Sequence, residues 1–279
     1  MRDRGSVFRR LLAALAALAV LATAGCSRGD ASATRLAVTG STTILPIAEV
    51  SAEMFQKAHP GTRVLVSGVG SSAGIESVSQ GSADIGTSSR DLKPAEAGLG
   101  LVDTPIAYDA IAVIVNPGNP VRGLTTEQIR DIFEGRITNW KQVGGLDMPM
   151  GLVNRDEASG TREAFSNLVL KGKPFDPQAA VLPGTGQVRS VVAGTRSAIG
   201  YISYGFVTSE VRALAVDGVE PSPATTADGK YPIGRVLHFL TKGAPTGLAK
   251  EYIDFVLSPA IQTKVIADAG FIGIAGKAR

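Results

Sequence analysis

The chain has 279 residues, of which 44% are hydrophobic and 19% are charged, a composition that excludes a disordered or fibrous protein. Its formal charge is +3, and the first 25 residues hold four arginines against one aspartate. The rest of the chain is therefore neutral overall, which does not favour binding to nucleic acid.

Residues 1–25 have the pattern of an export signal. Their arginines precede an apolar run, Leu11–Leu21, that is too short to span a bilayer. Small residues follow, and then Cys26, the only cysteine of the chain. We expect a lipoprotein-type signal peptide, lipid attachment at Cys26 and a tether over residues 26–34. The alternative is ordinary cleavage that leaves a free thiol, because Thr23 stands where a lipid-attachment motif usually has Leu.

Beyond the tether, segments with the alternation of strands and segments with the apolar spacing of helices follow one another. Strands are expected at residues 35–39, 62–68, 84–86, 108–115, 150–154, 199–203 and 234–240. Helices are expected at residues 44–58, 75–80, 126–133, 161–170, 188–193, 248–257 and 260–269. Strands that alternate with helices predict a parallel α/β architecture.

The order of these elements favours two lobes. The first lobe is expected to contain residues 35–112 together with 230–279, and the second lobe residues 113–207. Residues 208–229 lie between them and are rich in Pro, Ala, Thr and Gly, so we expect a loop that returns the chain to the first lobe.

Loops rich in Gly, Ser and Thr lead into several of the expected helices. They are Gly40–Thr43, Gly70–Gly74, Ser159–Thr161 and Gly184–Gly186, with a further polar turn at Thr87–Asp91. Helix N-termini carry unpaired N–H groups and a partial positive charge, so several that converge would bind a small oxyanion. For any one loop alone, ordinary helix capping is the better explanation, so the prediction depends on the recurrence of such loops.

Arg155 adds a positive charge to one of these loops, four residues before Ser159. A guanidinium can hold two oxygens of a tetrahedral anion at once. The same loop would then offer the guanidinium, a hydroxyl and helix-end N–H groups, and Glu157 is in a position to orient the guanidinium.

These motifs, in this order, resemble those of the phosphate-binding proteins of bacterial phosphate ABC transporters. The resemblance extends from Leu36 to about Ile274. The matching stretches are residues 40–46, 70–75, 83–86, 124–129, 139–140, 155–161 and 198–201.

The resemblance implies a type II periplasmic-binding-protein fold, with two α/β lobes joined by two crossing hinge strands. We place the hinge near Ala112–Val115 and Ser203–Val207. It also implies an extracytoplasmic, non-enzymatic monomer that closes on dehydrated inorganic phosphate and delivers it to ABC transporter permease subunits. Such a protein needs no cofactor or metal, and we expect it in the periplasm or on the outer face of the cell membrane, held by the lipid on Cys26.

The resemblance also implies the site. The phosphate-binding residues are expected to be Thr42, Thr43, Ser71, Ser89, Arg155, Ser159, Gly160 and Thr161, with Ser41, Ser72, Arg90 and Glu157 in supporting roles. Ser89 departs from the family, whose well-known members have an aspartate there that accepts a hydrogen bond from the proton of phosphate. A serine can still accept through its lone pairs, but it rejects sulfate less strongly. Arg90 either binds the anion or pairs with Asp91 or Asp84.

Other interpretations stay open. The same fold could bind sulfate, molybdate or arsenate, or could act as a sensor without a permease. Residues 70–74 also fit the Gly-x-Ser-x-Gly pattern of serine hydrolases, with Ser72 as nucleophile and His238 later in the chain. However, His238 lies inside a strand-like apolar run. Two distant histidines and one cysteine give little support to a metal site.

Overall fold

The computed structural model describes residues 33–274. The expected signal peptide, the lipidation of Cys26 and all but the last two residues of the expected tether lie outside this range. Within it, no helix is both long and apolar enough to cross a bilayer.

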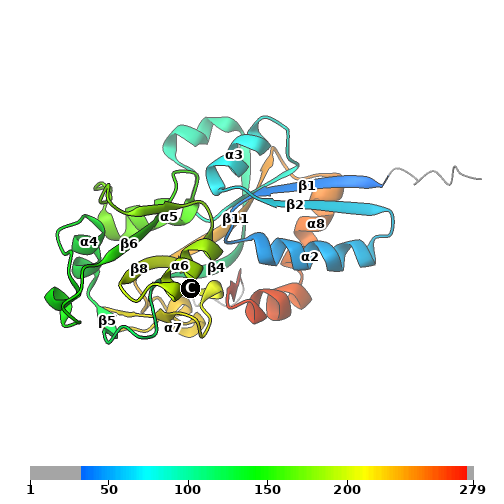
Figure 1. The fold of residues 1–279 in the computed structure, drawn as a ribbon. Coiled ribbons are helices and arrows are strands. Elements are labelled where there is room, and N and C mark those ends of the chain that lie inside the picture. Colours follow the sequence, from blue (N-terminus) through cyan, green and yellow to red (C-terminus); the bar gives the residue numbers. More distant parts are fainter. Residues whose placement is uncertain (1–32, 275–279) are drawn as a thin grey trace, which may run out of the picture.

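Lobe 1, on the right in Figure 1, is built from both ends of the described chain. Its core consists of buried side chains from residues 36–107 and 237–271. Its elements are β1 (Thr34–Gly40), α2 (Leu45–Ala58), β2 (Thr62–Gly68), α3 (Ser71–Ser79), β3 (Ile85–Ser88), the 3₁₀ helix Pro94–Leu99, β11 (Gly234–Lys242), α8 (Gly247–Leu257), the π-helical segment Ile261–Ile266 and β12 (Ile272–Gly273).

Lobe 2, on the left in Figure 1, has two further core clusters, drawn from residues 110–233. Its elements are β5 (Gly123–Leu124), α4 (Thr126–Phe133), the 3₁₀ helix Trp140–Val143, β6 (Gly151–Arg155), α5 (Gly160–Phe165) with the π-helical segment Ser166–Leu170, β7 (Ala180–Leu182), α6 (Thr185–Gly194), β8 (Ala198–Ser203), the 3₁₀ helix Tyr204–Phe206, β9 (Arg212–Ala213), β10 (Ala215–Val216) and α7 (Pro223–Ala227).

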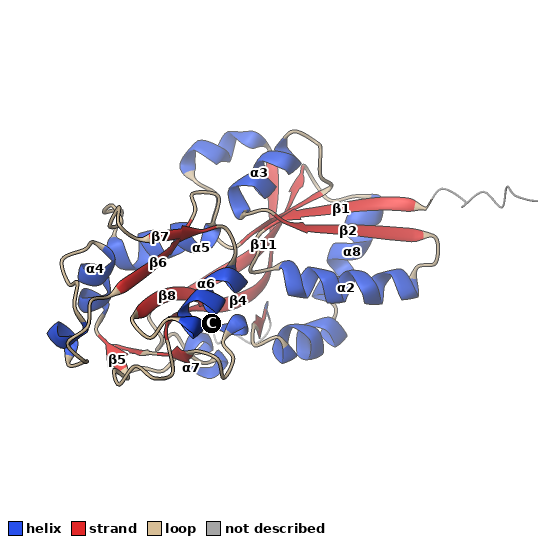
Figure 2. Cartoon of the chain, viewed as in Figure 1, coloured by secondary structure: helices blue, strands red, loops and turns tan. Residues whose placement is uncertain are grey.

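One long strand, β4 (Leu101–Val115), connects the lobes (Figure 2). The sheet has the order β2-β1-β3-β11-β4-β8-β6-β7. Residues 101–105 and 107–110 of β4 pair with β11, with an irregularity at residue 106, and residues 111–115 pair with β8 in lobe 2. Residues 110–115 are all buried, as the unbroken apolar run of this segment requires.

The expected α/β, two-lobed fold is confirmed, and the strongest patterns formed the expected elements. α2 carries a proline in its first turn and buries Ile47, Ala48 and Phe55 along one face. α4 begins after Thr125, whose side chain accepts a hydrogen bond from the N–H of Gln128 while the Gln128 side chain bonds back to Thr125.

Two expectations about the return of the chain need correction. Residues 208–229 are not all loop, because they include β9, β10 and the short helix α7, which is capped by Ser222. The second hinge segment is not at residues 203–207. Ser203 still pairs with Ile111 in lobe 2, and buried Tyr231 and Ile233 keep the chain in the lobe 2 core. The chain crosses back where β11 begins.

Candidate functional site

The polar loops predicted from the sequence meet where lobe 1 faces lobe 2. Thr42 and Thr43, just before α2, face residues at the starts of α5 and α6. The hydroxyl oxygens of Thr42 and Thr185 lie 3.0 Å apart, and those of Thr43 and Thr161 lie 3.2 Å apart. These hydrogen bonds join the two lobes, so the structure is in a closed arrangement.

The lobes approach so closely that two glycines are required at the contact. A Cβ atom on Gly160 would lie 2.8 Å from the Ser89 Oγ and closer still to the Ser71 Oγ. Gly70 has a φ of 104°, and a Cβ there would lie 2.7 Å from the carbonyl oxygen of Ala158. Both serines belong to lobe 1, and the N–H of Ser89 donates to the Ser71 Oγ at 3.1 Å.

Arg155 ends β6 and turns its guanidinium into this contact, where the residue is only 1% exposed. The guanidinium donates to the carbonyl oxygens of Leu182 and Pro183 at 3.1 and 2.7 Å. It also donates to the hydroxyls of Thr185 and Thr42 at 3.2 and 3.3 Å. No carboxylate of the described chain forms an ion pair with it. Burial lowers the pKa of Arg155, yet a guanidinium stays charged in proteins. A buried cation with neutral partners attracts an anion.

The start of α5 supplies further donors beside Arg155. The Ser159 Oγ caps the helix by accepting the N–H of Arg162 at 3.2 Å, which leaves the hydroxyl proton free to donate elsewhere. Gly160 and Thr161 occupy the first turn, where backbone N–H groups have no partner within the helix. Ser159, Gly160 and Thr161 are all buried in the contact.

The sequence interpretation missed a second arginine in the contact. Arg235, on β11, pairs with Asp109 on β4, and both side chains are almost fully buried. The Asp109 Oδ2 accepts from the Arg235 Nε at 2.9 Å and from Nη2 at 2.7 Å, while the Ser203 hydroxyl donates to Oδ1. Burial raises the pKa of Asp109, and the adjacent Arg235 opposes that rise.

Arg235 also reaches the hydroxyls of the site from both lobes. Its Nη1 donates to the Thr161 Oγ1 at 2.9 Å and to the carbonyl oxygen of Ser89 at 3.1 Å. Its Nη2 donates to the Thr43 Oγ1 at 3.3 Å. The only sequence signal for this residue was a charge at the start of an apolar strand, which surface arginines share.

Among the expected supporting residues, Ser41 and Ser72 have structural partners. The Ser41 Oγ accepts the N–H of Thr43 at 3.2 Å in the turn before α2. The Ser72 Oγ accepts from Arg90 at 3.3 Å. Arg90 forms a two-pronged ion pair with the Glu96 carboxylate at 2.7 and 2.8 Å, so its charge is already matched. The carboxylates of Asp91 and Asp84, the partners expected from the sequence, do not pair with it, and Asp91 accepts only through its backbone carbonyl oxygen at 2.9 Å.

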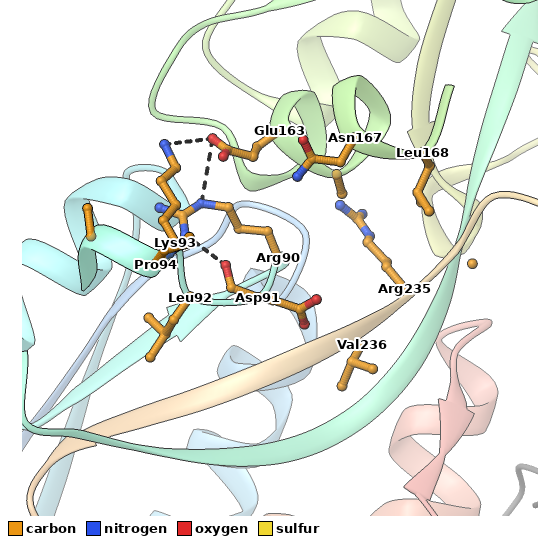
Figure 3. A pocket seen from close by; sticks show the side chains of 13 residues that line it. Arg90, Asp91, Leu92, Lys93, Pro94, Glu163, Asn167, Leu168, Arg235 and Val236 are labelled. Atoms are coloured by element: carbon orange, nitrogen blue, oxygen red, sulfur yellow. Dashed lines mark hydrogen bonds and ion pairs between the residues drawn. The ribbon is translucent and has the colours of Figure 1, made fainter. Parts of the chain in front are cut away.

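Glu157 does not orient Arg155. Its side chain is exposed and forms no hydrogen bond or ion pair with any other residue between 33 and 274. A different acid, Glu163 on α5, reaches across to lobe 1, where its carboxylate lies 2.8 Å from the Lys93 Nζ and 3.9 Å from the Arg90 Nε (Figure 3). These groups, with Arg235, line a pocket of about 690 Å³ between the lobes.

The structure does not bring Ser72 and His238 together. The Ser72 hydroxyl is bonded to Arg90, whereas the ring nitrogens of His238 face Asp103 at 2.8 Å and Asp91 at 3.2 Å. Among residues 33–274 there is also no group of three or more His, Cys, Asp and Glu side chains placed to hold a metal ion.

Two α/β lobes that meet over a buried, unpaired guanidinium define the class of two-lobed proteins that bind a small ligand between their lobes. Comparison with known proteins agrees with this class. The family model described as "PBP superfamily domain" matches residues 27–260. The phosphate-binding protein PstS of Bacillus subtilis is 36% identical over 243 residues, which are 86% of this chain and 80% of that protein.

Solved structures give the same result. One from Clostridium perfringens, assigned as a phosphate ABC transporter substrate-binding protein and containing bound phosphate, has a TM-score of 0.83 and 38% identity, covering 86% of this chain and all of the other. An ABC-type phosphate transport receptor from Vibrio cholerae has a TM-score of 0.73 and 36% identity, covering 85% and 99%. The chain therefore belongs to the PBP superfamily and, within it, to the family of these phosphate-binding proteins.

Proposed function

We propose that the protein is the exported substrate-binding protein of a phosphate importer, which binds inorganic phosphate between its lobes and delivers it to ABC transporter permease subunits. The observation that carries this proposal is the buried Arg155 guanidinium, which has only neutral hydrogen-bond partners in the closed contact. A phosphate ion there supplies the missing negative charge. The names of the relatives in Bacillus, Clostridium and Vibrio support phosphate as the ligand.

In this proposal, donors from both lobes surround the anion. They are the hydroxyls or N–H groups of Thr42, Thr43, Ser71 and Ser89 from lobe 1, and of Arg155, Ser159, Gly160 and Thr161 from lobe 2. Lobe 2 here comprises residues 110–233, and lobe 1 the described residues on either side of them. Phosphate favours the closed form because only that form offers both sets of donors at once. Closure then presents both lobes to the permease.

Ser89 supports a broader candidate ligand class. Its hydroxyl lies 3.3 Å from the Ser71 hydroxyl, and no carboxylate is among the proposed phosphate-binding groups. Discrimination between protonated phosphate and fully ionised sulfate therefore depends on hydroxyl acceptors alone. Sulfate, molybdate and arsenate remain alternative ligands of the same site, and a sensor role without a permease is the alternative task.

The location of the protein is part of the proposal. The arginine-rich apolar N-terminus and the position of Cys26 support export and lipid attachment, which would hold a monomer in the periplasm or on the outer face of the cell membrane. Mass spectrometry of the mature N-terminus tests this: a diacylglyceryl group on Cys26 is expected, and an unmodified thiol would contradict it.

Calorimetric titration of the full-length protein tests the ligand. Copurified anion is first removed by unfolding, dialysis and refolding. We expect phosphate to bind with micromolar or tighter affinity, about 8 kcal/mol or more. Equal binding of sulfate would broaden the ligand class to tetrahedral oxyanions. The proposal fails if a folded sample binds none of phosphate, sulfate, molybdate and arsenate. Ester hydrolysis that is lost in Ser72→Ala would instead establish an enzyme.

The site assignment is tested by Arg155→Ala. This variant removes the charged contact, and we expect a loss of at least about 2 kcal/mol, or roughly 30-fold in Kd. Arg136→Ala is the matched control, because Arg136 is a half-exposed arginine of the same lobe whose partners, Asp131 and Glu134, are not among the proposed phosphate-binding residues. Near-normal affinity in Arg155→Ala would contradict the assignment.

A further inference from the structure

We propose that Arg235 is a positioning residue of the anion site, which fixes the hydroxyls of Thr43 and Thr161 as hydrogen-bond donors toward the bound anion. The inference rests on the proposed function and adds to it a second arginine that acts through two threonines. No part of the sequence pattern pointed to this role.

The first argument is the position of Arg235. It stands directly opposite Asp109 in the pairing of β11 with β4. Two residues further along, at Ile111, β4 stops pairing with β11 and pairs with β8 of lobe 2. The side chain extends from β11 toward α5, as Figure 3 shows. Arg235 is therefore fixed on the strand pair that joins the lobes, within reach of both.

The second argument is a count of its hydrogen bonds. A guanidinium has five N–H groups. In Arg235, two donate to the Asp109 carboxylate, one to the carbonyl oxygen of Ser89, and two to the hydroxyls of Thr161 and Thr43. All five are occupied, and the charge is matched by Asp109. Arg235 therefore has no N–H group left for the anion, in contrast to Arg155, which has no carboxylate partner.

The third argument concerns what these bonds do to the two threonines. A hydroxyl has one proton and two lone pairs, so it can face a ligand either as donor or as acceptor. Thr43 and Thr161 each accept from the Arg235 guanidinium, which occupies a lone pair on each hydroxyl. One of the two protons serves the bond between the threonines in this structure, and an anion that replaces this bond receives both protons. A cationic donor also polarises the hydroxyl and strengthens the bond that it donates. The site thereby presents donors, which suits the unprotonated oxygens of an oxyanion.

The bonds also link this effect to closure. Thr43 belongs to lobe 1 and Thr161 to lobe 2, and their hydroxyl oxygens are 3.2 Å apart. Arg235 can hold both only when the lobes are together. The two threonines therefore become oriented donors in the closed form, the form that the anion stabilises.

A double-mutant cycle of phosphate binding tests the proposal in the full-length protein. Arg235→Lys keeps the positive charge beside Asp109 but loses the planar guanidinium that bonds to several partners at once. Thr161→Val removes the hydroxyl at nearly constant shape. We expect each single change to weaken phosphate binding about tenfold, the scale of one charge-assisted hydrogen bond. The double variant should lose only about tenfold to twentyfold, because both changes remove the same oriented donor.

The control cycle pairs Arg235→Lys with Thr185→Val. Thr185 bonds to Arg155 and Thr42 and not to Arg235, so the two losses should multiply to about a hundredfold. If the double variant of the Thr161 cycle also lost about a hundredfold in affinity, the two single losses would be independent. That result would overturn the positioning role of Arg235 while leaving the phosphate-binding function intact. Failure of the unsubstituted protein to bind phosphate or sulfate would overturn both.

A second pair of variants serves if Arg235→Lys does not fold. Thr43→Ser keeps the hydroxyl and Thr43→Val removes it, while Arg235 is untouched. We expect the serine variant to stay within about threefold of the original affinity and the valine variant to lose about tenfold. Equal losses in both variants, or losses that track the melting temperature of the ligand-free protein, would show a merely structural role and overturn the proposal.

Discussion

Gly160→Ala is a direct test of whether phosphate binds in the closed arrangement. The added methyl group would lie 2.8 Å from both the Ser89 Oγ and the Ser71 Cβ, whereas ordinary contact begins at 3.4 Å. These atoms belong to the opposite lobe, so the lobes must separate by at least about 0.6 Å. The hydroxyl contacts of 3.0 and 3.2 Å across the lobes would then exceed 3.5 Å and be lost.

The expected loss follows from the bonds that break. Two or three hydrogen bonds between the lobes, at about 1 kcal/mol each, correspond to a Kd about 30- to 150-fold weaker. The ligand-free fold should not suffer, because Gly160 lies in α5 without a positive φ and alanine favours a helix by up to about 1 kcal/mol. Affinity and melting temperature should therefore move in opposite directions.

Calorimetry and thermal unfolding measure the two quantities. Gly194→Ala is the control, since a methyl group there, at the last residue of α6, meets nothing within 4 Å. Unchanged phosphate affinity in Gly160→Ala would refute the reasoning, because the bound state would then not contain this contact. A lower melting temperature would show damage to the fold instead of to closure.

Two further predictions concern ion pairs. Glu163→Gln removes the partly exposed ion pairs to Lys93 and Arg90 across the lobes, so phosphate affinity should fall by at most about fivefold in low salt. The difference should vanish near 0.5 M salt, roughly where screening is complete. An equal loss at both salt concentrations would contradict this prediction. A hydrogen bond from Arg90 lowers the pKa of Glu96 in the folded protein. The ionised carboxylate therefore stabilises the fold at pH values above the pKa that Glu96 has in the unfolded chain, and this contribution is lost as the pH falls through its lower pKa in the folded protein. Glu96→Gln should therefore lower the melting temperature at pH 7, with a difference that shrinks below about pH 4; a constant difference would show that the charge of Glu96 is irrelevant.

The parts of the site that could be predicted were those carried by local sequence. Arg155 ends a strand and Ser159 caps the helix that follows, while Thr43 stands two residues before a helix with clear apolar periodicity. Their positions follow from the strand and helices that they flank, so short local sequence patterns were sufficient to predict them.

Arg235 could not be predicted in this way because its partners are far away in the chain. Asp109 is 126 residues distant and Thr43 is 192 residues distant, and only strand pairing brings them together. The partner of Arg90 was missed for a different reason. The 3₁₀ helix Pro94–Leu99, which no periodic pattern signals, turns Glu96 back toward Arg90. Helix and strand patterns locate elements, whereas such pairings depend on the completed tertiary fold.

The division of lobe 1 between the two ends of the chain affects the order in which the protein can fold during synthesis. The core of lobe 2 is continuous in sequence and is complete once residue 233 has emerged. Lobe 1 must wait for β11, which lies between β3 and β4 in its sheet, and for Tyr252 and Phe271, which complete its core. Lobe 2 can therefore fold first as a template, and β11 adds Arg235 to the anion site among the last steps.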